Sequence, residues 1–200
     1  MAHLRPLRLD EIQDEEIKER FTHYKNTRGF TPHSIMTMAR RPNIVKAFMA
    51  LNQAVLYEGT VSEELKMLIS LMTSQATGCQ YCQAHMANLS SIYKASDEKI
   101  RAIWEFQTSE LFSDAERAAL TLAYKSALVP NHANKEDFDE VKKYFDEDQI
   151  VEIVAAIALF GYLNRWNDTV ATELEEHAAN VATRAISPAG WAVGKHSQHR

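Results

Sequence analysis

Two cysteines and a histidine within one short segment are the part of this sequence best equipped for chemistry. Cys79 and Cys82 are separated by two residues, and His85 follows three residues after the second cysteine. Residues three apart share one face of a helix, so a helix would hold both thiols close enough for reversible disulfide formation. Gly78 stands directly before Cys79 and is typical of a helix end. We therefore expect both thiols in the first turn of a new helix.

The start of a helix favours the reactive form of these thiols. Unpartnered backbone N–H groups and the helix dipole stabilise a thiolate there, which lowers the thiol pKa. His85 lies one turn beyond Cys82 and can accept its proton or stabilise its thiolate. A dithiol with a base at a helix start is typical of a disulfide exchanger or a peroxide reductase. We expect Cys82 to attack a peroxide or disulfide and Cys79 to resolve the product, and the reverse order stays open.

Other uses of the motif fit less well. Haem attachment requires a histidine directly after the second cysteine, and that position is Gln83. A structural zinc site requires four ligands, whereas the motif supplies three and only the distant His132 could be a fourth. Both cysteines could also be small apolar residues of a core helix. We expect no cofactor and no metal ion, and we assign no role to His132, His196 or His199.

The elements that would position this motif are all helical. Glycine and proline are scarce, at 6 and 5 of 200 residues, and alternating β-branched runs are absent. Helical periodicity and its punctuation predict about eight to ten helices, covering residues 10–27, 42–58, 62–77, 79–94, 96–106, 113–128, 135–145, 148–166 and 167–183. We therefore expect an all-α helical bundle.

Serine caps mark the starts of two of these helices. Ser62, followed by two glutamates, predicts the start of an almost wholly apolar helix, which we place at the centre. Ser113 and Glu116 form a capping-box pattern. The similarity of the two starts predicts two related helical halves, although any two capped helices could look this alike. The mixed polar and aromatic segment 164–168 is interpreted as a solvated helix end, and a role in lining a pocket stays open as the alternative.

The ends of the chain and its net charge indicate its domain organisation, its partners and its localisation. We expect one domain over residues 1–185, and an arm or frayed end from Ile186, where helical periodicity stops. A net charge of −5, from 22 basic and 27 acidic residues, argues against nucleic acid as a partner. The first residues lack the apolar segment of a secretory signal, and the longest apolar run, from Ile150 to Leu163, is too short to span a membrane. We expect a cytoplasmic protein with no membrane partner.

Several stretches of the sequence occur together in one known family. They are GCQYCQAH at 78–85, LFSDAERAAL at 111–120, DQIVEIV at 148–154 and LNR at 163–165, and the tail at 190–196 is similar too. On these residues the chain from about Val61 to Leu174 resembles the alkylhydroperoxidase D-like branch of the carboxymuconolactone decarboxylase family. The resemblance implies an all-α bundle that assembles as dimers, trimers or hexamers. It also implies a dithiol that reduces hydroperoxides and is re-reduced by a thiol protein or a small thiol.

The sequence departs from the family pattern at two positions. The family places a proton-relay glutamate twelve residues before the first cysteine, and that position is Met67. Glu64, about one helical turn earlier, is our choice for this role. The acidic residues that we keep as alternatives are Glu58, Glu63 and Glu116. The family histidine commonly lies four residues after the second cysteine, where this chain has Met86 and places His85 one residue earlier.

These observations predict a thiol-dependent antioxidant enzyme. It would reduce hydroperoxides or exchange disulfides through Cys79 and Cys82, with His85 as the base and Glu64 orienting or reprotonating it. One alternative is a lactone or small-acid decarboxylase on the same scaffold, which would not need the cysteines. Another is a non-catalytic helical oligomer that senses oxidants. We expect a homo-oligomer.

Overall fold

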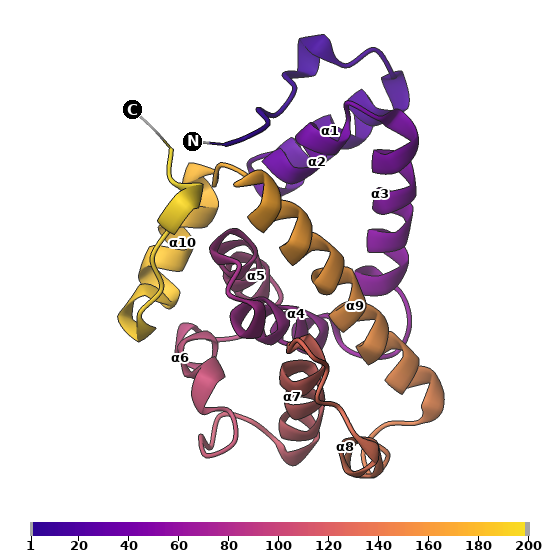
Figure 1. The fold of residues 1–200 in the computed structure, drawn as a ribbon, viewed down its shortest axis with the longest axis vertical. Coiled ribbons are helices and arrows are strands. Elements are labelled where there is room, and N and C mark those ends of the chain that lie inside the picture. The colour runs from indigo at the N-terminus through magenta and orange to yellow at the C-terminus, as the bar shows by residue number, and fades with distance from the viewer. Residues whose placement is uncertain (1, 199–200) are drawn as a thin grey trace.

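The computed structural model describes residues 2–198 of the chain, and this part is entirely helical (Figure 1). It has ten α-helices, four short 3-10 segments and no strand, so the predicted all-α bundle is confirmed for the described residues. The α-helices are α1 (Glu15–Arg28), α2 (His33–Met38), α3 (Pro42–Tyr57), α4 (Glu63–Thr77), α5 (Gln80–Ile92), α6 (Asp97–Arg101), α7 (Asp114–Ala127), α8 (Lys135–Val141), α9 (Glu147–Val170) and α10 (Glu176–Ala185). The 3-10 segments are η1 (Leu9–Glu11), η2 (Ala102–Glu105), η3 (Ser187–Ala189) and η4 (Gly194–His196).

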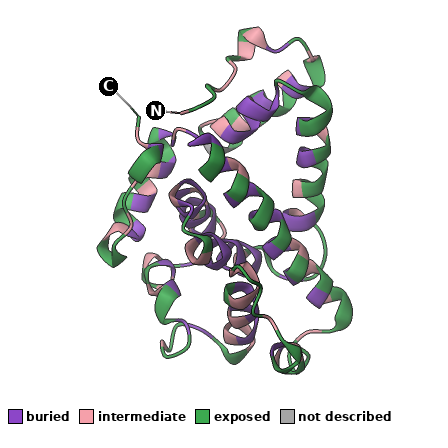
Figure 2. Cartoon of the chain, viewed as in Figure 1, coloured by how far each residue is buried: buried purple, intermediate pink, exposed green. Residues whose placement is uncertain are grey.

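Helices α4 and α5 form the centre of the bundle. Helix α4 packs against α5, α7 and α9, and every residue from 65 to 74 is buried. Figure 2 shows α4 and α5 mostly buried, whereas α3 and α9 carry exposed faces. The hydroxyl of Ser62 accepts a hydrogen bond from the Leu65 N–H at 3.3 Å and caps α4. The central helix predicted after this serine is therefore confirmed.

The junction between α4 and α5 positions the two thiols. Gly78 ends α4 in the left-handed region, with φ of 79°, which favours glycine because no Cβ is present to clash. Cys79 follows as the N-cap residue of α5, and Cys82 is the third residue of that helix. The predicted helix break and the predicted place of both cysteines at a helix start are confirmed.

Helix α9 differs from the prediction. The sequence predicts one helix to 166 and another from 167, but α9 continues without a break to Val170, and Ala171 in the left-handed region ends it. Because the chain stays helical there, Asn164 and Asn167 face inward and are 3% and 1% exposed. The interpretation of residues 164–168 as a solvated helix end is therefore wrong for these two residues.

Two other predicted helices are shorter than expected. Helix α1 begins at Glu15 rather than at Asp10, because the Asp14 carboxylate accepts the Ile17 N–H and caps the helix there. Helix α8 ends at Val141, so residues 142–145 lie outside it. Of the helices among residues 2–198, none combines the length and the hydropathy that crossing a membrane requires.

The segment after α10 packs onto the bundle. The indole Nε1 of Trp191 donates to the carbonyl of Gln80 at 3.1 Å, and the backbone carbonyl of His196 accepts from the Leu174 N–H at 2.9 Å. The His196 side chain is fully buried. Residues 187–198, called the C-terminal arm below, thus lie against the bundle. His199 lies outside the described residues.

Candidate active site

The two thiols occupy one helical turn but have different neighbours. Both cysteines are free and buried, with 1% of Cys79 and 2% of Cys82 exposed. The side-chain amide of Asn167, on α9, donates to the sulfur of Cys82 at 3.3 Å. Cys79 lies instead beside His196, from the C-terminal arm. Helices that are distant in sequence therefore give each thiol its own environment.

The two thiols differ in their pKa values. A hydrogen bond from the Cys82 thiol is the main cause that lowers the pKa of Cys79 to about 6, against burial, which raises it. The positive charge of His196, when its ring is protonated, lowers the pKa of Cys79 further. Burial raises the pKa of Cys82 well above its ordinary range, and the negative charge of Cys79 adds to this effect. Near neutral pH the resting pair is therefore a Cys79 thiolate and a Cys82 thiol, whereas the sequence predicts the thiolate beside His85.

His85 belongs to a buried hydrogen-bonded group around Glu175. The Nε2 atom of His85 lies 2.6 Å from Oε2 of Glu175. The hydroxyl of Tyr81 donates to Oε1 of the same carboxylate at 2.9 Å, and the backbone N–H of His33 donates to it as well. The rings of Tyr81 and His85 are stacked, with centroids 4.3 Å apart. These contacts hold the imidazole in one orientation.

Glu175 is ionised in spite of its burial. Burial raises its pKa, but the charges of His85 and His33 and the hydrogen bonds to it outweigh this effect and lower the pKa below its ordinary value. Glu175 is also the N-cap residue of α10, where the helix dipole stabilises a negative charge. A buried carboxylate on one nitrogen of a histidine orients the ring and stabilises an imidazolium, which is the arrangement that proton transfer needs.

A small pocket of about 70 Å³ opens beside Cys82 and His85. Its polar lining includes these two side chains and Asn167, and Cys79 does not line it. The remaining walls are largely apolar and aromatic, and they include Phe48, Leu56, Tyr57, Tyr81, Leu89, Phe160 and Leu163. The pocket therefore suits a small apolar molecule whose reacting atom would meet Cys82 and His85.

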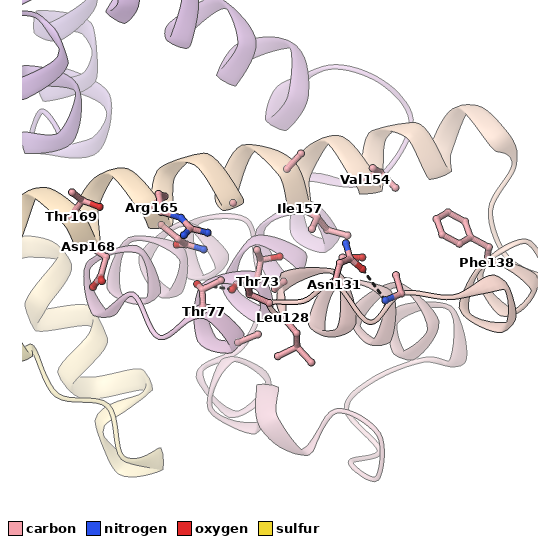
Figure 3. A pocket seen from close by; sticks show the side chains of 18 residues that line it. Thr73, Thr77, Leu128, Asn131, Phe138, Val154, Ile157, Arg165, Asp168 and Thr169 are labelled. Atoms are coloured by element: carbon pink, nitrogen blue, oxygen red, sulfur yellow. Dashed lines mark hydrogen bonds between the residues drawn. The ribbon is translucent and has the colours of Figure 1, made fainter.

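A larger, open cleft of about 970 Å³ is lined by a separate set of residues (Figure 3). Its walls come from the end of α4, the loop after α7 and one face of α9. Figure 3 shows Asp168 and Thr169 at one end of this cleft and Phe138 at the other. The carboxylate of Asp168 is half exposed there and pairs with Nζ of Lys195 at 2.8 Å.

Of the four predicted site residues, Cys79, Cys82 and His85 come together, and Glu64 does not join them. The carboxylate of Glu64 pairs with Nζ of Lys99 at 3.0 Å. It lies at the start of α4, whereas the cysteines follow the end of that helix, about 20 Å away at 1.5 Å per residue. The carboxylate beside His85 is Glu175 instead.

The alternatives to Glu64 also lie elsewhere. Glu116 shares Lys99 with it, at 2.6 Å from Nζ. Glu63 is the first residue of α4, and Glu58 follows the end of α3, where its backbone carbonyl accepts a hydrogen bond from Lys66. Met67, at the position of the family glutamate, is fully buried in the core.

Sequence reasoning missed three residues that contact the reactive groups. Asn167 lies in the polar and aromatic segment 164–168, for which the sequence favours a solvated helix end over the lining of a pocket. His196 lies in the tail that resembles the family, and this was its only signal. Glu175 is one of three acidic residues at 173–176, a pattern typical of a solvated helix start, so no local signal distinguishes it.

The fold and this site define a helical protein with a buried CxxC dithiol. Residues 42–125 match the family model of the carboxymuconolactone decarboxylase family. The crystal structure of the debrominase Bmp8 is 32% identical, covers 91% of this chain and 97% of its own, and superposes with a TM-score of 0.83. This chain belongs to the carboxymuconolactone decarboxylase family.

Two further relatives lie at lower identity. A peroxidase-related protein from Ralstonia eutropha JMP134 with an alkylhydroperoxidase AhpD core is 22% identical, covers 88% of this chain and 94% of its own, and has a TM-score of 0.79. This likeness concerns the fold. The uncharacterized protein YdfG of Bacillus subtilis (strain 168) is 24% identical over 112 residues, which are 55% of this chain and 74% of that protein. The family and its enzymatic members support an enzyme, on a scaffold that carries more than one activity.

Proposed function

We propose that this protein is a thiol-dependent reductase that transfers two electrons from Cys79 and Cys82 to a small apolar hydroperoxide. The observation that supports it most is the meeting of Cys82 and His85 at one small apolar pocket, with Cys79 one helical turn away. A hydroperoxide with an apolar body would place its O–O bond at the polar end of this pocket.

The first step of the proposed reaction oxidises Cys82. Its proton passes to the Cys79 thiolate, and the Cys82 sulfur attacks the terminal peroxide oxygen. An S–O bond forms, the O–O bond breaks, and the leaving alkoxide takes a proton from His85. The carboxylate of Glu175, 2.6 Å from Nε2, stabilises the imidazolium that donates it. The products are an alcohol and a Cys82 sulfenic acid.

The second step closes the disulfide. The sulfur of Cys79 attacks the sulfur of the sulfenic acid, the S–O bond breaks, and the hydroxide leaves as water with the proton that Cys79 had received. The two thiols and one hydroperoxide thus become one disulfide, one alcohol and one water. A small thiol or a thiol protein would then reduce the disulfide by exchange. We extend the proposal to a homo-oligomer, which light scattering on the purified protein would test.

Serine substitutions test this function. Wild-type protein and the Cys79→Ser, Cys82→Ser and doubly substituted variants would be assayed for reduction of cumene hydroperoxide with dithiothreitol as the reductant. We expect Cys82→Ser to lose turnover as completely as the double variant, and Cys79→Ser to turn over more slowly than the wild type, because only dithiothreitol can then reduce its sulfenic acid. Undiminished turnover in the double variant would refute the proposal and favour thiol-independent chemistry. Stoichiometric oxidation of the wild type without turnover would favour a sensor.

A second candidate is reductive dehalogenation of a small halogenated aromatic molecule. The aromatic walls of the pocket and the 32% identity to the debrominase Bmp8 favour it. A Bmp8 variant in which one cysteine is replaced by alanine has been crystallised with 2,3,4-tribromopyrrole. In this chain the Cys82 sulfur would take the bromine, and the ring carbon would take a proton from His85. Attack by Cys79 would then release bromide and leave the same disulfide, so the electrons balance.

The two candidates differ in a measurable product. Reduced protein would be mixed with one equivalent of 2,3,4-tribromopyrrole, and bromide and the dibrominated product would be quantified. Bromide release that is lost in Cys82→Ser and faster than hydroperoxide reduction would favour dehalogenation. Hydroperoxide reduction without bromide release would favour the peroxidase.

A further inference from the structure

The C-terminal arm brings a second histidine to the dithiol, on the side away from the apolar pocket. The sulfur of Cys79, a carboxylate oxygen of Asp168 and a ring nitrogen of His196 all lie within 4.8 Å of one another. These residues come from the start of α5, from α9 and from η4, so the tertiary fold alone assembles them. Cys79 and His196 are buried, and Asp168 is 48% exposed.

The protonation of His196 follows from its hydrogen bond. Its Nδ1 atom lies 2.7 Å from the backbone carbonyl oxygen of Thr172. A carbonyl only accepts, so Nδ1 carries the hydrogen and Nε2 of the neutral ring carries the lone pair. Within residues 2–198 the buried Nε2 atom has no hydrogen-bond partner. An unpartnered buried lone pair is costly unless something binds it.

The arrangement does not suit a thiol–histidine–carboxylate relay. In such a relay the carboxylate binds the nitrogen opposite to the one that faces the nucleophile. Here Asp168 lies 3.9 Å from Nε2, and the opposite nitrogen, Nδ1, is bound to the carbonyl of Thr172 and to no carboxylate. Three electron-pair donors therefore converge on one point.

We propose that Cys79, Asp168 and His196 form a binding site for a divalent transition-metal ion, with Zn²⁺ as the ion that fits best. Thiolate, imidazole and carboxylate are the ligands that zinc uses. The hydrogen bond from Nδ1 of His196 to a backbone carbonyl is the usual support of a metal-binding histidine.

The distances require one modest movement. Tetrahedral zinc with bonds of about 2.0–2.3 Å holds its ligand atoms roughly 3.5 Å apart, so contraction by about 1 Å brings the three atoms into range. Asp168, half exposed at the end of the open cleft, can make this movement and admits the ion (Figure 3). Its exposed ion pair with Lys195 costs little to break. Three protein ligands and a water form an exchangeable site rather than a structural one.

Metal binding and disulfide formation would exclude each other. A metal ion on Cys79 displaces the thiol proton and holds the sulfur that must attack oxidised Cys82. Zn²⁺ would therefore inhibit the reduced enzyme reversibly, and oxidation to the disulfide would release the ion. This regulatory consequence rests on the proposed function, whereas the metal site does not.

Cobalt titration tests the site without turnover. The fully reduced, metal-free protein would be titrated anaerobically with Co²⁺, and the thiolate-to-cobalt charge-transfer band would be followed, with Zn²⁺ as the competitor. We expect the band to be absent in Cys79→Ser. We expect His196→Gln and Asp168→Asn to weaken Co²⁺ binding at least ~10-fold.

A second histidine variant provides the matched control. His85 belongs to the sequence motif, but its Nε2 atom is bound to Glu175, so His85→Gln should bind Co²⁺ as the wild type does. Circular dichroism would show whether each variant is folded. If His196→Gln does not fold, Asp168→Asn still tests the site, because Asp168 is half exposed and its substitution should not disturb the core. Wild-type affinity in both His196→Gln and Asp168→Asn would overturn the proposal. Loss of the cobalt band in His85→Gln would assign the metal to the CxxC motif instead and would also overturn it.

Inhibition is measured separately. Zn²⁺ should inhibit hydroperoxide reduction by the wild type, and a chelator should restore the activity. The inhibition of Asp168→Asn should need at least ~10-fold more Zn²⁺. If the band depends on His196 but no hydroperoxide is reduced, the proposed function fails and the metal site stands. Equal inhibition of Asp168→Asn and wild type would refute the regulatory role.

Discussion

The two sides of the first turn of α5 differ in almost every physical property. On the Cys82 side the walls are apolar, the histidine is bound to a buried carboxylate, and the thiol keeps its proton. On the Cys79 side the histidine has an unpartnered nitrogen and lies near the sulfur, an exposed carboxylate lines an open cleft, and the thiol loses its proton with a pKa of about 6. Two residues with nearly the same local sequence environment thus differ in protonation, because Cys79 is a thiolate and Cys82 is a neutral thiol.

The comparison shows that the elements packed around a CxxC pair determine the environment and the protonation of each cysteine. Helix α9 contributes Asn167 to one sulfur and Asp168 to the vicinity of the other, because adjacent helical residues face different directions. The segments on either side of α10 contribute Glu175 to one histidine and His196 to the other sulfur. In the proposed reaction the Cys82 side would bind the substrate, and the Cys79 side holds the negative charge of the resting dithiol.

The largest expected effect is a difference between the two cysteines in their rate of reaction with hydroperoxide. With one equivalent of hydroperoxide and no reductant, Cys79→Ser should still react once and accumulate a sulfenic acid, because Cys82 faces the pocket. Cys82→Ser should react at least ~10³-fold more slowly. Stopped-flow measurements with a sulfenic-acid trap provide the rates. The opposite ranking would make Cys79 the attacking residue.

The two histidines should differ next. His85→Gln removes the group proposed to protonate the leaving oxygen and should lower turnover by about 10²-fold. His196→Gln leaves the pocket intact and should lower turnover less than tenfold. Steady-state kinetics in metal-free buffer compare them. Equal losses of turnover in the two variants would contradict the proposal that His85, on the pocket side, protonates the leaving oxygen.

Glu175 is a positioning residue that acts through His85. Glu175→Gln keeps the shape but removes the charge, and we expect turnover to fall about tenfold or more. The neutral side chain no longer stabilises the imidazolium that donates the proton, so the alkaline side of the pH–rate profile should also move, toward lower pH. A merely structural role would lower the folded fraction and leave the pH profile of the active protein unchanged.

The pKa of Cys79 predicts a pH-dependent stability. It falls from 9.0 to about 6 on folding, so between these values the unfolded chain binds a proton that the folded chain has lost. The unfolding free energy of the reduced protein should therefore rise with pH from about 6 to 9, and this gain should be lost as pH falls through 6. Urea unfolding of wild type and Cys79→Ser measures the slope. An equal slope in both proteins would contradict the lowered pKa.

The smallest effect is expected far from the dithiol. Glu64→Gln removes a partly exposed ion pair with Lys99, so its unfolding free energy should change by at most about 1 kcal/mol. Its turnover should equal that of the wild type, because Glu64 lies at the other end of α4. A loss of turnover comparable to that of Glu175→Gln would restore Glu64 as the relay carboxylate.

Short-range signals predicted the fold and the motif well. Ser62, Gly78 and the Ser113–Glu116 pair mark real helix ends, because caps depend on residues within one turn. The same rules failed at residues 166–167, where a polar segment suggested an end but α9 continues. Burial of Asn167 against Cys82 stabilises that continuation, and no local pattern reveals such a contact.

The sequence by itself determined the class of this protein: an all-α family member with two thiols and a histidine at the start of one helix. The tertiary structure decided which groups serve each thiol. Glu175 is 90 residues from His85 in the chain, and His196 is more than 100 residues from Cys79. Periodicity and capping act over one or two turns, whereas the charge of a buried thiol depends on whichever groups the fold brings within a few ångströms. For that reason the dithiol could be found from the sequence, and its two unlike sides could not.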